Sequence, residues 1–248
     1  MKALVCTKPG KLEYADLAEP VLKSGQAIIR IRNICICGTD LHAFEGTQPY
    51  FNYPRILGHE LSGELEDFDS APGFQKGDKV TFLPYVNCGI CIACRAGKTN
   101  CCERLEVFGV HIDGGMVDYF SIPARLLVAS QGLNLSELSL VEPFAIGAHG
   151  IRRADVKQDE FVLVMGAGPI GICAMEFARL RGAKIIAMDT NTYRLDFCRS
   201  KLGVIHIINA GDKNIVEQLK DITHGEMPTV VIDASGNLQA INQGVHYL

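Results

Sequence analysis

The pattern of hydrophobic and polar residues changes near the middle of the chain. Up to about residue 130, short runs of branched and apolar residues are bounded by glycine or proline, which is typical of β-strands. The clearest of these runs are residues 26–35, 56–67 and 79–84. Residues 138–153 have helical spacing instead, with Pro143 in a first turn or at a kink. The first part of the chain is therefore predicted to be β-rich and to end in a helix.

From residue 159 onward, apolar runs alternate with helical segments. The predicted strands are residues 161–165, 184–189, 205–209 and 229–233. The predicted helices are residues 170–181, 192–202 and 213–224. Strands separated by single helices imply a parallel sheet with right-handed crossovers. We therefore expect an α/β protein with a β-rich domain at residues 1–150 and a doubly wound parallel domain at residues 151–248.

A glycine-rich sequence stands between the first predicted strand of the second domain and its helix. Gly166 permits a tight turn, Gly168 lets backbone amides approach a pyrophosphate, and Gly171 allows the helix to pack closely on the strand. A glycine-rich structural turn is the alternative, but the flanking strand and helix favour dinucleotide binding. The residues of this loop predicted to bind the cofactor are Gly166, Gly168, Pro169, Ile170 and Gly171.

Asp189 ends the next predicted strand, where a dinucleotide-binding fingerprint has an acidic residue. Its carboxylate is expected to accept hydrogen bonds from the adenosine ribose hydroxyls and to repel a 2′-phosphate. We therefore expect NAD rather than NADP as cofactor. Arg194 is close enough in sequence to bind the cofactor and soften this preference; the alternative is an exposed helix residue.

Composition limits the possible classes of function. Hydrophobic residues make up 48% and charged residues 21%, so the chain can bury a core. With 24 basic and 28 acidic side chains the net charge is -4, which is unlike a general nucleic-acid binder. Residues 161–175, the most apolar stretch, are interrupted by glycine and proline and are too short to span a bilayer. The N-terminus lacks signal-peptide anatomy, and we expect a cytosolic protein that binds neither nucleic acid nor membrane.

Five of the ten cysteines lie between residues 88 and 102. In a cytosolic chain this density indicates metal binding rather than disulfides. The spacing fits four thiolates around one tetrahedral structural zinc, in a lobe at residues 86–104. The predicted ligands are Cys88, Cys91, Cys94 and a fourth cysteine, which the spacing leaves open between Cys101 and Cys102. A zinc ribbon that binds nucleic acid is the alternative, but nearby acidic residues offset the basic ones and no aromatic residue is interleaved.

A second set of potential metal ligands consists of Cys37 and the adjacent pair His59 and Glu60. A thiolate, an imidazole and a carboxylate would make a three-ligand zinc site with a vacant position for water or substrate. A lone cysteine or histidine is more often a packed core residue. Their combination favours a catalytic metal site.

Several motifs occur together in a characteristic order: Gly38-Thr39-Asp40 after Cys37, Gly58-His59-Glu60, the cysteine lobe, Glu142-Pro143 and the glycine-rich loop. Over essentially the whole chain they resemble the zinc-dependent medium-chain dehydrogenase/reductase family. That family has a GroES-like catalytic domain and a Rossmann NAD-binding domain. Residues 48–54, 99–103, 109–115 and 142–146 are most similar to its polyol and sugar-acid branch.

The resemblance implies an enzyme, a zinc-containing oxidoreductase that transfers a hydride between NAD(H) and a secondary alcohol of a sugar acid or polyol. The alternative activity is that of an ordinary alcohol or threonine-type dehydrogenase. The resemblance also favours Cys102 as the fourth ligand of the lobe. It implies that Cys37 and His59 bind the catalytic zinc, and that Glu60 and Glu142 bind it directly or through water.

Further roles come from the same resemblance. Asp40 corresponds to an acid that orients the zinc-bound histidine. Thr39 corresponds to the hydroxyl beside the substrate oxygen, and His42 to the outer end of a proton relay, with a polar surface residue as the alternative. The substrate-pocket candidates, for which core or loop structure is the alternative, are Tyr50, Phe51, His111 and Asp113.

The chain departs from the family pattern at its C-terminal end. A complete dinucleotide-binding sheet of this kind has six strands, and the sequence ends after the fourth strand and one more helix. We therefore expect a partial Rossmann domain. The alternative is a truncated, inactive fragment that keeps the zinc and nucleotide sites. Full-length members are expected to form homo-oligomers, and the oligomeric state of this chain stays open.

Overall fold

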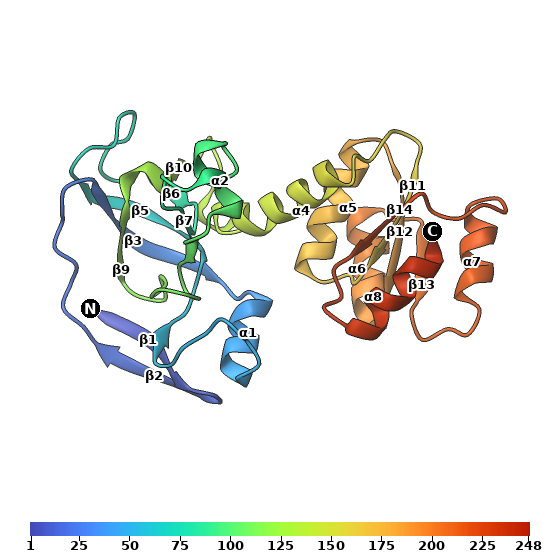
Figure 1. Cartoon of the computed structure of the whole chain (residues 1–248), viewed down its shortest axis with the longest axis horizontal. Helices are drawn as coiled ribbons and strands as arrows, with labels where there is room; N and C mark the ends of the chain where they lie inside the picture. The colour runs from blue at the N-terminus through green and yellow to red at the C-terminus, as the bar shows by residue number, and fades with distance from the viewer. The chain divides into compact units, whose positions relative to one another are not determined.

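The computed structural model describes residues 1–248 and divides into two compact units, Met1–Glu142 and Pro143–Leu248. The division falls near the start of helix α4 (Val141–Arg153), which can be followed in Figure 1. The sequence-based boundary at residues 150 and 151 lies near the other end of the same helix. Pro143 is in the first turn of α4, the position at which proline is tolerated.

The first unit is β-rich, as predicted, and its paired strands are antiparallel. A five-stranded sheet has the order β10-β6-β5-β3-β9, and a three-stranded sheet has the order β2-β1-β4. The strands of the larger sheet are β3 (Gln26–Cys35), β5 (Glu60–Phe68), β6 (Lys79–Phe82), β9 (Tyr119–Pro123) and β10 (Leu127–Ala129). Those of the smaller sheet are β1 (Lys2–Lys8), β2 (Lys11–Asp16) and β4 (Arg55–Ile56).

Short elements complete this unit. The two-residue strands β7 (Tyr85–Val86) and β8 (Glu106–Val107) pair with each other on either side of the cysteine lobe. The helical segments are α1 (Gly38–Glu45), α2 (Ile92–Arg95), η1 (Thr99–Cys101), η2 (Ala124–Leu126) and α3 (Leu135–Leu138). The core includes three phenylalanine rings, Phe82, Phe108 and Phe120, whose centroids are 5.0 to 5.9 Å apart.

One predicted strand, residues 56–67, is two strands in the structure. Gly58 lies between β4 and β5 with φ at 96°, a backbone conformation that residues other than glycine rarely adopt. A Cβ atom at Gly58 would also lie 2.8 Å from the Met116 side chain. The chain therefore turns at Gly58, which places His59 and Glu60 at the start of β5.

The second unit contains the predicted parallel sheet. Its strand order is β13-β12-β11-β14, and every neighbouring pair is parallel. The strands are β11 (Phe161–Met165), β12 (Lys184–Asp189), β13 (His206–Asn209) and β14 (Val230–Asp233). The helices are α5 (Pro169–Leu180), α6 (Thr192–Leu202), α7 (Ile215–Ile222), α8 (Leu238–Gly244) and the short η3 (Val245–Tyr247). The α/β fold class is thus confirmed.

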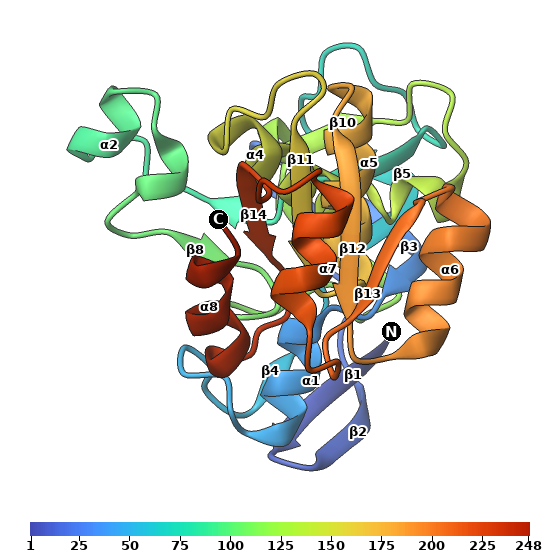
Figure 2. The ribbon, with the colours of Figure 1, turned by 90° about the vertical axis from the view of Figure 1, so that its right-hand side faces the viewer.

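Helices flank this sheet (Figure 2), and apolar residues are buried against both of its faces. Val162 and Val164 of β11 pack with residues of α5 and α6, whereas Leu163 and Met165 pack with residues of α7, α8 and η3. Burial on both faces explains why the strands read as continuous apolar runs in the sequence. No helix in the structure combines the length and apolarity needed to cross a membrane.

Candidate metal and dinucleotide sites

Three side chains of the first unit form a compact cluster of potential metal ligands. The ligand atoms of Cys37, His59 and Glu60 all lie within 4.8 Å of one another. The pairing of β3 with β5 sets this arrangement, because Cys35 lies opposite Glu60 in the ladder. Cys37 follows β3 and caps the N-terminus of α1. We call these residues the three-residue cluster.

The environment of the three-residue cluster suits a bound cation. Burial raises the pKa of the Cys37 thiol to about 11 and also raises the pKa of the Glu60 carboxyl. The Nδ1 atom of His59 is buried without a hydrogen-bond partner. Buried polar groups normally have partners. The set of sulfur, nitrogen and oxygen donors is one that zinc binds, so the residues present fit this metal.

Asp40 connects the two segments that carry the cluster. Its carboxylate is buried and accepts hydrogen bonds from the backbone amides of Cys37 at 2.9 Å and Gly58 at 3.3 Å. Its Oδ1 atom lies 3.9 Å from His59 Nδ1. Burial raises the pKa of Asp40. The structure thus places Asp40 beside the histidine that it is predicted to orient.

Glu142 lies near the three-residue cluster but is not part of it. It is the second residue of α4, is 9% exposed, and accepts a hydrogen bond from the Tyr85 hydroxyl. Its charge contributes to raising the pKa of Glu60, after the larger effect of burial. Sequence reasoning missed Tyr85. The available signal was its position three residues before Cys88, directly ahead of the lobe.

Thr39 and His42 lie on α1. The backbone amide and hydroxyl of Thr39 both act to lower the pKa of Cys37, against the larger effect of burial. The His42 side chain is 61% exposed, and its Nδ1 atom lies 3.3 Å from the Thr47 hydroxyl and 3.4 Å from a Glu45 carboxylate oxygen. Residues three apart share one face of a helix, which is compatible with the predicted relay.

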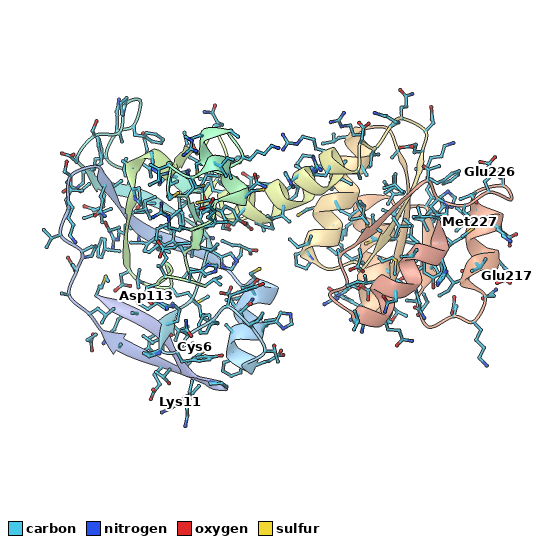
Figure 3. All side chains as sticks on the ribbon, viewed as in Figure 1. Cys6, Lys11, Asp113, Glu217, Glu226 and Met227 are labelled. Carbon is cyan, nitrogen blue, oxygen red and sulfur yellow. The ribbon has the colours of Figure 1, made fainter.

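The four substrate-pocket candidates have different environments. Tyr50 is exposed, and its ring centroid lies 6.2 Å from that of His111. Phe51 is buried and packs edge-on against Tyr53, so its surroundings are those of a core residue. Asp113, labelled in Figure 3, accepts a hydrogen bond from the Ile56 amide at 3.1 Å and holds its loop to β4.

The loop that carries His111 and Asp113 packs against the segment before His59. A Cβ atom at Gly109 would lie 2.8 Å from the Gly58 amide nitrogen, so only glycine permits this approach. His111 Nδ1 accepts a hydrogen bond from the Val107 amide at 3.1 Å. In a neutral imidazole the proton then resides on Nε2, which is left as a donor.

The cysteine lobe forms a second cluster. The sulfur atoms of Cys88, Cys91, Cys94 and Cys102 all lie within 4.8 Å of one another, whereas Cys101 is exposed and outside the cluster. Hydrogen bonds from backbone amides lower the pKa of Cys88 to about 6. This favours the thiolate that zinc requires at Cys88, whereas burial and hydrogen bonds with Cys88 and Cys94 raise the pKa of Cys102 to about 11. Four thiolates leave no open position, so this arrangement suits a structural metal.

A pocket of about 400 Å³ lies at the carboxyl ends of the parallel strands, where dinucleotides bind in open α/β sheets. Gly166, Asp189, Arg194 and Asn237 are among the residues that line it. A Cβ atom at Gly171 would lie 1.8 Å from the Gly166 carbonyl oxygen. Pro169 and Ile170 begin α5, and a Cβ atom at the preceding Gly168 would meet only Arg194 Nη1, at 3.8 Å.

Asp189 is anchored by the glycine-rich loop. One carboxylate oxygen accepts from the Ala167 amide at 2.7 Å, and the other accepts from the Asn191 amide at 2.8 Å. Arg194 lies 3.6 Å from Asp189 and remains half exposed. Carboxylate oxygens have further lone pairs, so Asp189 can still accept ribose hydroxyls. The surroundings of these residues fit a bound NAD.

Comparison with known proteins agrees with this arrangement in both units. Residues 23–132 match the model of the alcohol dehydrogenase GroES-like domain. Residues 169–248 match the model of the zinc-binding dehydrogenase domain. The four-cysteine lobe and the three-residue cluster both lie in the first matched region, and the second begins within the glycine-rich loop, at Pro169.

Individual relatives match over almost the whole chain. L-galactonate-5-dehydrogenase from Escherichia coli K12 is 39% identical, over 100% of this chain and 73% of the relative. Sorbitol dehydrogenase from Bacillus subtilis is 31% identical, over 99% of this chain and 71% of the relative. A solved structure of an alcohol dehydrogenase from Escherichia coli CFT073, complexed with NADH, is 30% identical with a TM-score of 0.89. It covers 100% of this chain and 73% of that chain.

Proposed function

Because the chain belongs to the zinc-dependent alcohol dehydrogenase family, in which NAD is the cofactor, we propose that its substrate is a secondary alcohol of a sugar acid or polyol. The observation that carries this proposal is the three-residue cluster, where ligand atoms of a half-buried thiol, a buried imidazole and a buried carboxyl lie within 4.8 Å of one another. The relatives that act on L-galactonate and sorbitol, by their names, support this class of substrate.

In this proposal Cys37, His59 and Glu60 hold the catalytic zinc, and the four cysteines of the lobe hold a structural zinc. When bound, the catalytic zinc and NAD would supply polarisation of the alcohol and acceptance of its hydride. Asp40 orients His59 through its Nδ1 side, which leaves Nε2 to face the metal.

The residues of α1 handle the proton that the alcohol loses. The Thr39 hydroxyl, beside the Cys37 sulfur, accepts this proton and passes it toward His42. His42 is exposed and releases the proton to water, with Glu45 and Thr47 next to its ring. Because the His42 ring faces solvent, the positive charge that it carries after accepting the proton stays in contact with water.

We propose that Asp189 gives the site its preference for NAD over NADP. Its anchored carboxylate accepts the ribose hydroxyls, and its charge repels a 2′-phosphate. Arg194 is paired with Asp189, so its charge is directed to this carboxylate. Pro169 and Ile170 start the helix whose N-terminus faces the pyrophosphate.

Tyr50 and His111 are the best supported of the substrate-pocket candidates. Tyr50 is exposed beside His111, and His111 retains an Nε2 donor for a hydroxyl or carboxylate of the substrate. Phe51 and Asp113 contribute indirectly, since Phe51 packs in the core and Asp113 fixes the loop.

The metal sites also bear on the compartment. Zinc sites made of reduced cysteines suit the cytosol, where we expect the reaction to occur.

The test is NAD reduction by the full chain with L-galactonate, a hexitol, L-threonine and ethanol as substrates, combined with metal analysis. We expect two zinc sites and a preference for L-galactonate or the hexitol. Cys37→Ser should abolish turnover and leave the fold, whereas Cys91→Ser should lower stability, because a closed thiolate site contributes folding free energy. A preference for ethanol or L-threonine would instead assign an ordinary alcohol or threonine-type dehydrogenase.

A further inference from the structure

We propose that Tyr85 is a positioning residue that holds Glu142 outside the three-residue cluster and so keeps one coordination position of the metal open to substrate. This inference rests on the proposed function, since it requires the cluster to bind zinc. It concerns a hydroxyl group that lies outside every motif recognised in the sequence.

The geometry places Tyr85 and Glu142 in a single defined contact. The Tyr85 hydroxyl donates to Glu142 Oε1 at 2.5 Å. The Tyr85 hydroxyl has one proton to donate, and Glu142 accepts it. The backbone of Tyr85 is held by its pairing with Val107 in the β7–β8 ribbon, and Glu142 is held by the first turn of α4.

Glu142 is close enough to the cluster for its position to matter. The Ser139 hydroxyl, three residues before Glu142, lies 3.3 Å from Cys35 Sγ, and Cys35 is the ladder partner of Glu60. Both carboxyl groups are buried. A carboxylate is a competent zinc ligand, and a fourth protein ligand would complete a tetrahedral set. The site would then be closed in the same way as the four-cysteine lobe. An anchor on Glu142 is therefore a means of keeping the site open.

Removal of the Tyr85 hydroxyl should free Glu142 to occupy the open position. A hydrogen bond to a charged group is strong enough to shift such a competition by about tenfold or more. The loss should appear in the binding of any small ligand that needs the open position, independently of turnover.

The experiment measures azide binding to the full chain with cobalt(II) in place of zinc, from the visible absorption spectrum. The variants are Tyr85→Phe, Glu142→Gln and the double variant. Tyr119→Phe is the matched control, since this tyrosine is half-buried in the same unit and its ring lies near Arg30, 6.0 Å from the guanidinium carbon. The metal bound by the four-cysteine lobe contributes equally to all spectra.

Tyr85→Phe is expected to weaken azide binding about tenfold, and Tyr119→Phe is expected to leave it unchanged. In the Glu142→Gln background, Tyr85→Phe should have no further effect, because the competing carboxylate is gone. Equal azide affinity in wild type and Tyr85→Phe overturns the inference. The inference is also overturned if Tyr85→Phe weakens azide binding equally in the Glu142→Gln background.

Failure of the proposed function has a separate signature. A wild-type chain that takes up metal only in the four-cysteine lobe and shows no azide response lacks the open site altogether. If Tyr85→Phe does not fold, Glu142→Gln alone decides the question. Unchanged azide affinity supports the restraint on Glu142. Tighter binding, which would mean that Glu142 already competes in wild type, overturns it, and so does weaker binding.

Discussion

At the carboxyl end of β12, Asp189 accepts backbone hydrogen bonds from Ala167 and Asn191. Its carboxylate is therefore oriented by the protein before a cofactor binds. The same side chain shapes the glycine-rich loop and is placed to discriminate between NAD and NADP. Substitution at this position should consequently change both loop stability and cofactor preference.

We predict that Asp189→Ser weakens NADH binding by about tenfold, because an acceptor of the ribose hydroxyls is lost. The ratio of NADH to NADPH affinity should also fall, because the charge that repels a 2′-phosphate is removed. Fluorescence titration with the two cofactors measures the effect. Arg199→Gln is the control, because this exposed residue of α6 pairs with Asp196 and does not line the pocket. An unchanged NADH affinity in Asp189→Ser would contradict the assigned role.

The buried carboxyl groups near the metal cluster have a predictable pH dependence. Burial raises the pKa of Glu60 above its ordinary value of 4.5, and that of Asp40 above 3.8. In the metal-free chain, each group favours folding below its ordinary pKa. This contribution is lost as the pH rises through the raised value. Zinc binds the deprotonated ligands and should reverse this loss.

We therefore expect zinc to raise the unfolding temperature more at about pH 8 than at about pH 5. Thermal unfolding with zinc and with a chelator, at several pH values, provides the measurement. Cys37→Ser separates the two sites, because the four-cysteine lobe remains. Equal zinc stabilisation of wild type and Cys37→Ser at every pH would sink this explanation.

At the scale of elements, local sequence signals were sufficient where strands are buried on both faces and helices have polar caps. Residues 161–165, 184–189 and 192–202 were predicted with their observed bounds. The predicted helix 138–153 corresponds to α4, which begins three residues later, and Leu138 is the last residue of the short helix α3. Asn134 and Glu137 form a capping box that starts α3, a signal that apolar spacing alone does not contain.

Two glycines of the dinucleotide loop offer a matched pair of substitutions. At Gly171 a Cβ atom would lie 1.8 Å from the Gly166 carbonyl oxygen, so alanine must displace α5 from β11. At Gly168 the nearest atom is Arg194 Nη1 at 3.8 Å. The first position limits helix packing, and the second leaves room above the loop.

Gly171→Ala should lower the free energy of unfolding by about 1–3 kcal/mol. Gly168→Ala should lower it by less than about 1 kcal/mol but weaken NADH binding, because a methyl group would stand where the cofactor approaches. Denaturant unfolding and NADH titration of both variants provide the comparison. The assignment of roles is wrong if the two alanines have interchangeable effects.

At the scale of the whole molecule, the candidate metal ligands and the candidate dinucleotide pocket belong to different units. Both metal clusters lie in Met1–Glu142, and the pocket at the ends of the parallel strands lies in Pro143–Leu248. Sequence order and motif spacing were enough to assign most of these residues to their clusters. The hydrogen bond between Tyr85 and Glu142 was not accessible in this way, because 57 positions separate the two residues.

Hydrogen exchange measured by mass spectrometry should reflect this separation. Chelation is expected to increase exchange mainly in peptides from residues 1–142, where the thiolate and imidazole ligands lie. NADH should protect mainly peptides from residues 143–248. A uniform response of the whole chain to either treatment would contradict independent ligand sites.

The position of the cysteine lobe between β7 and β8 has a consequence for chain entropy. A ribbon of two-residue strands is too short to persist without further support. Metal ligation by Cys88 and Cys102 would cross-link the intervening segment and reduce the number of conformations open to it, as a disulfide does. Tyr85 lies just outside this cross-link. Loss of the metal from the lobe would therefore loosen the ribbon and alter the setting of Glu142 while every ligand of the other metal site remained chemically intact.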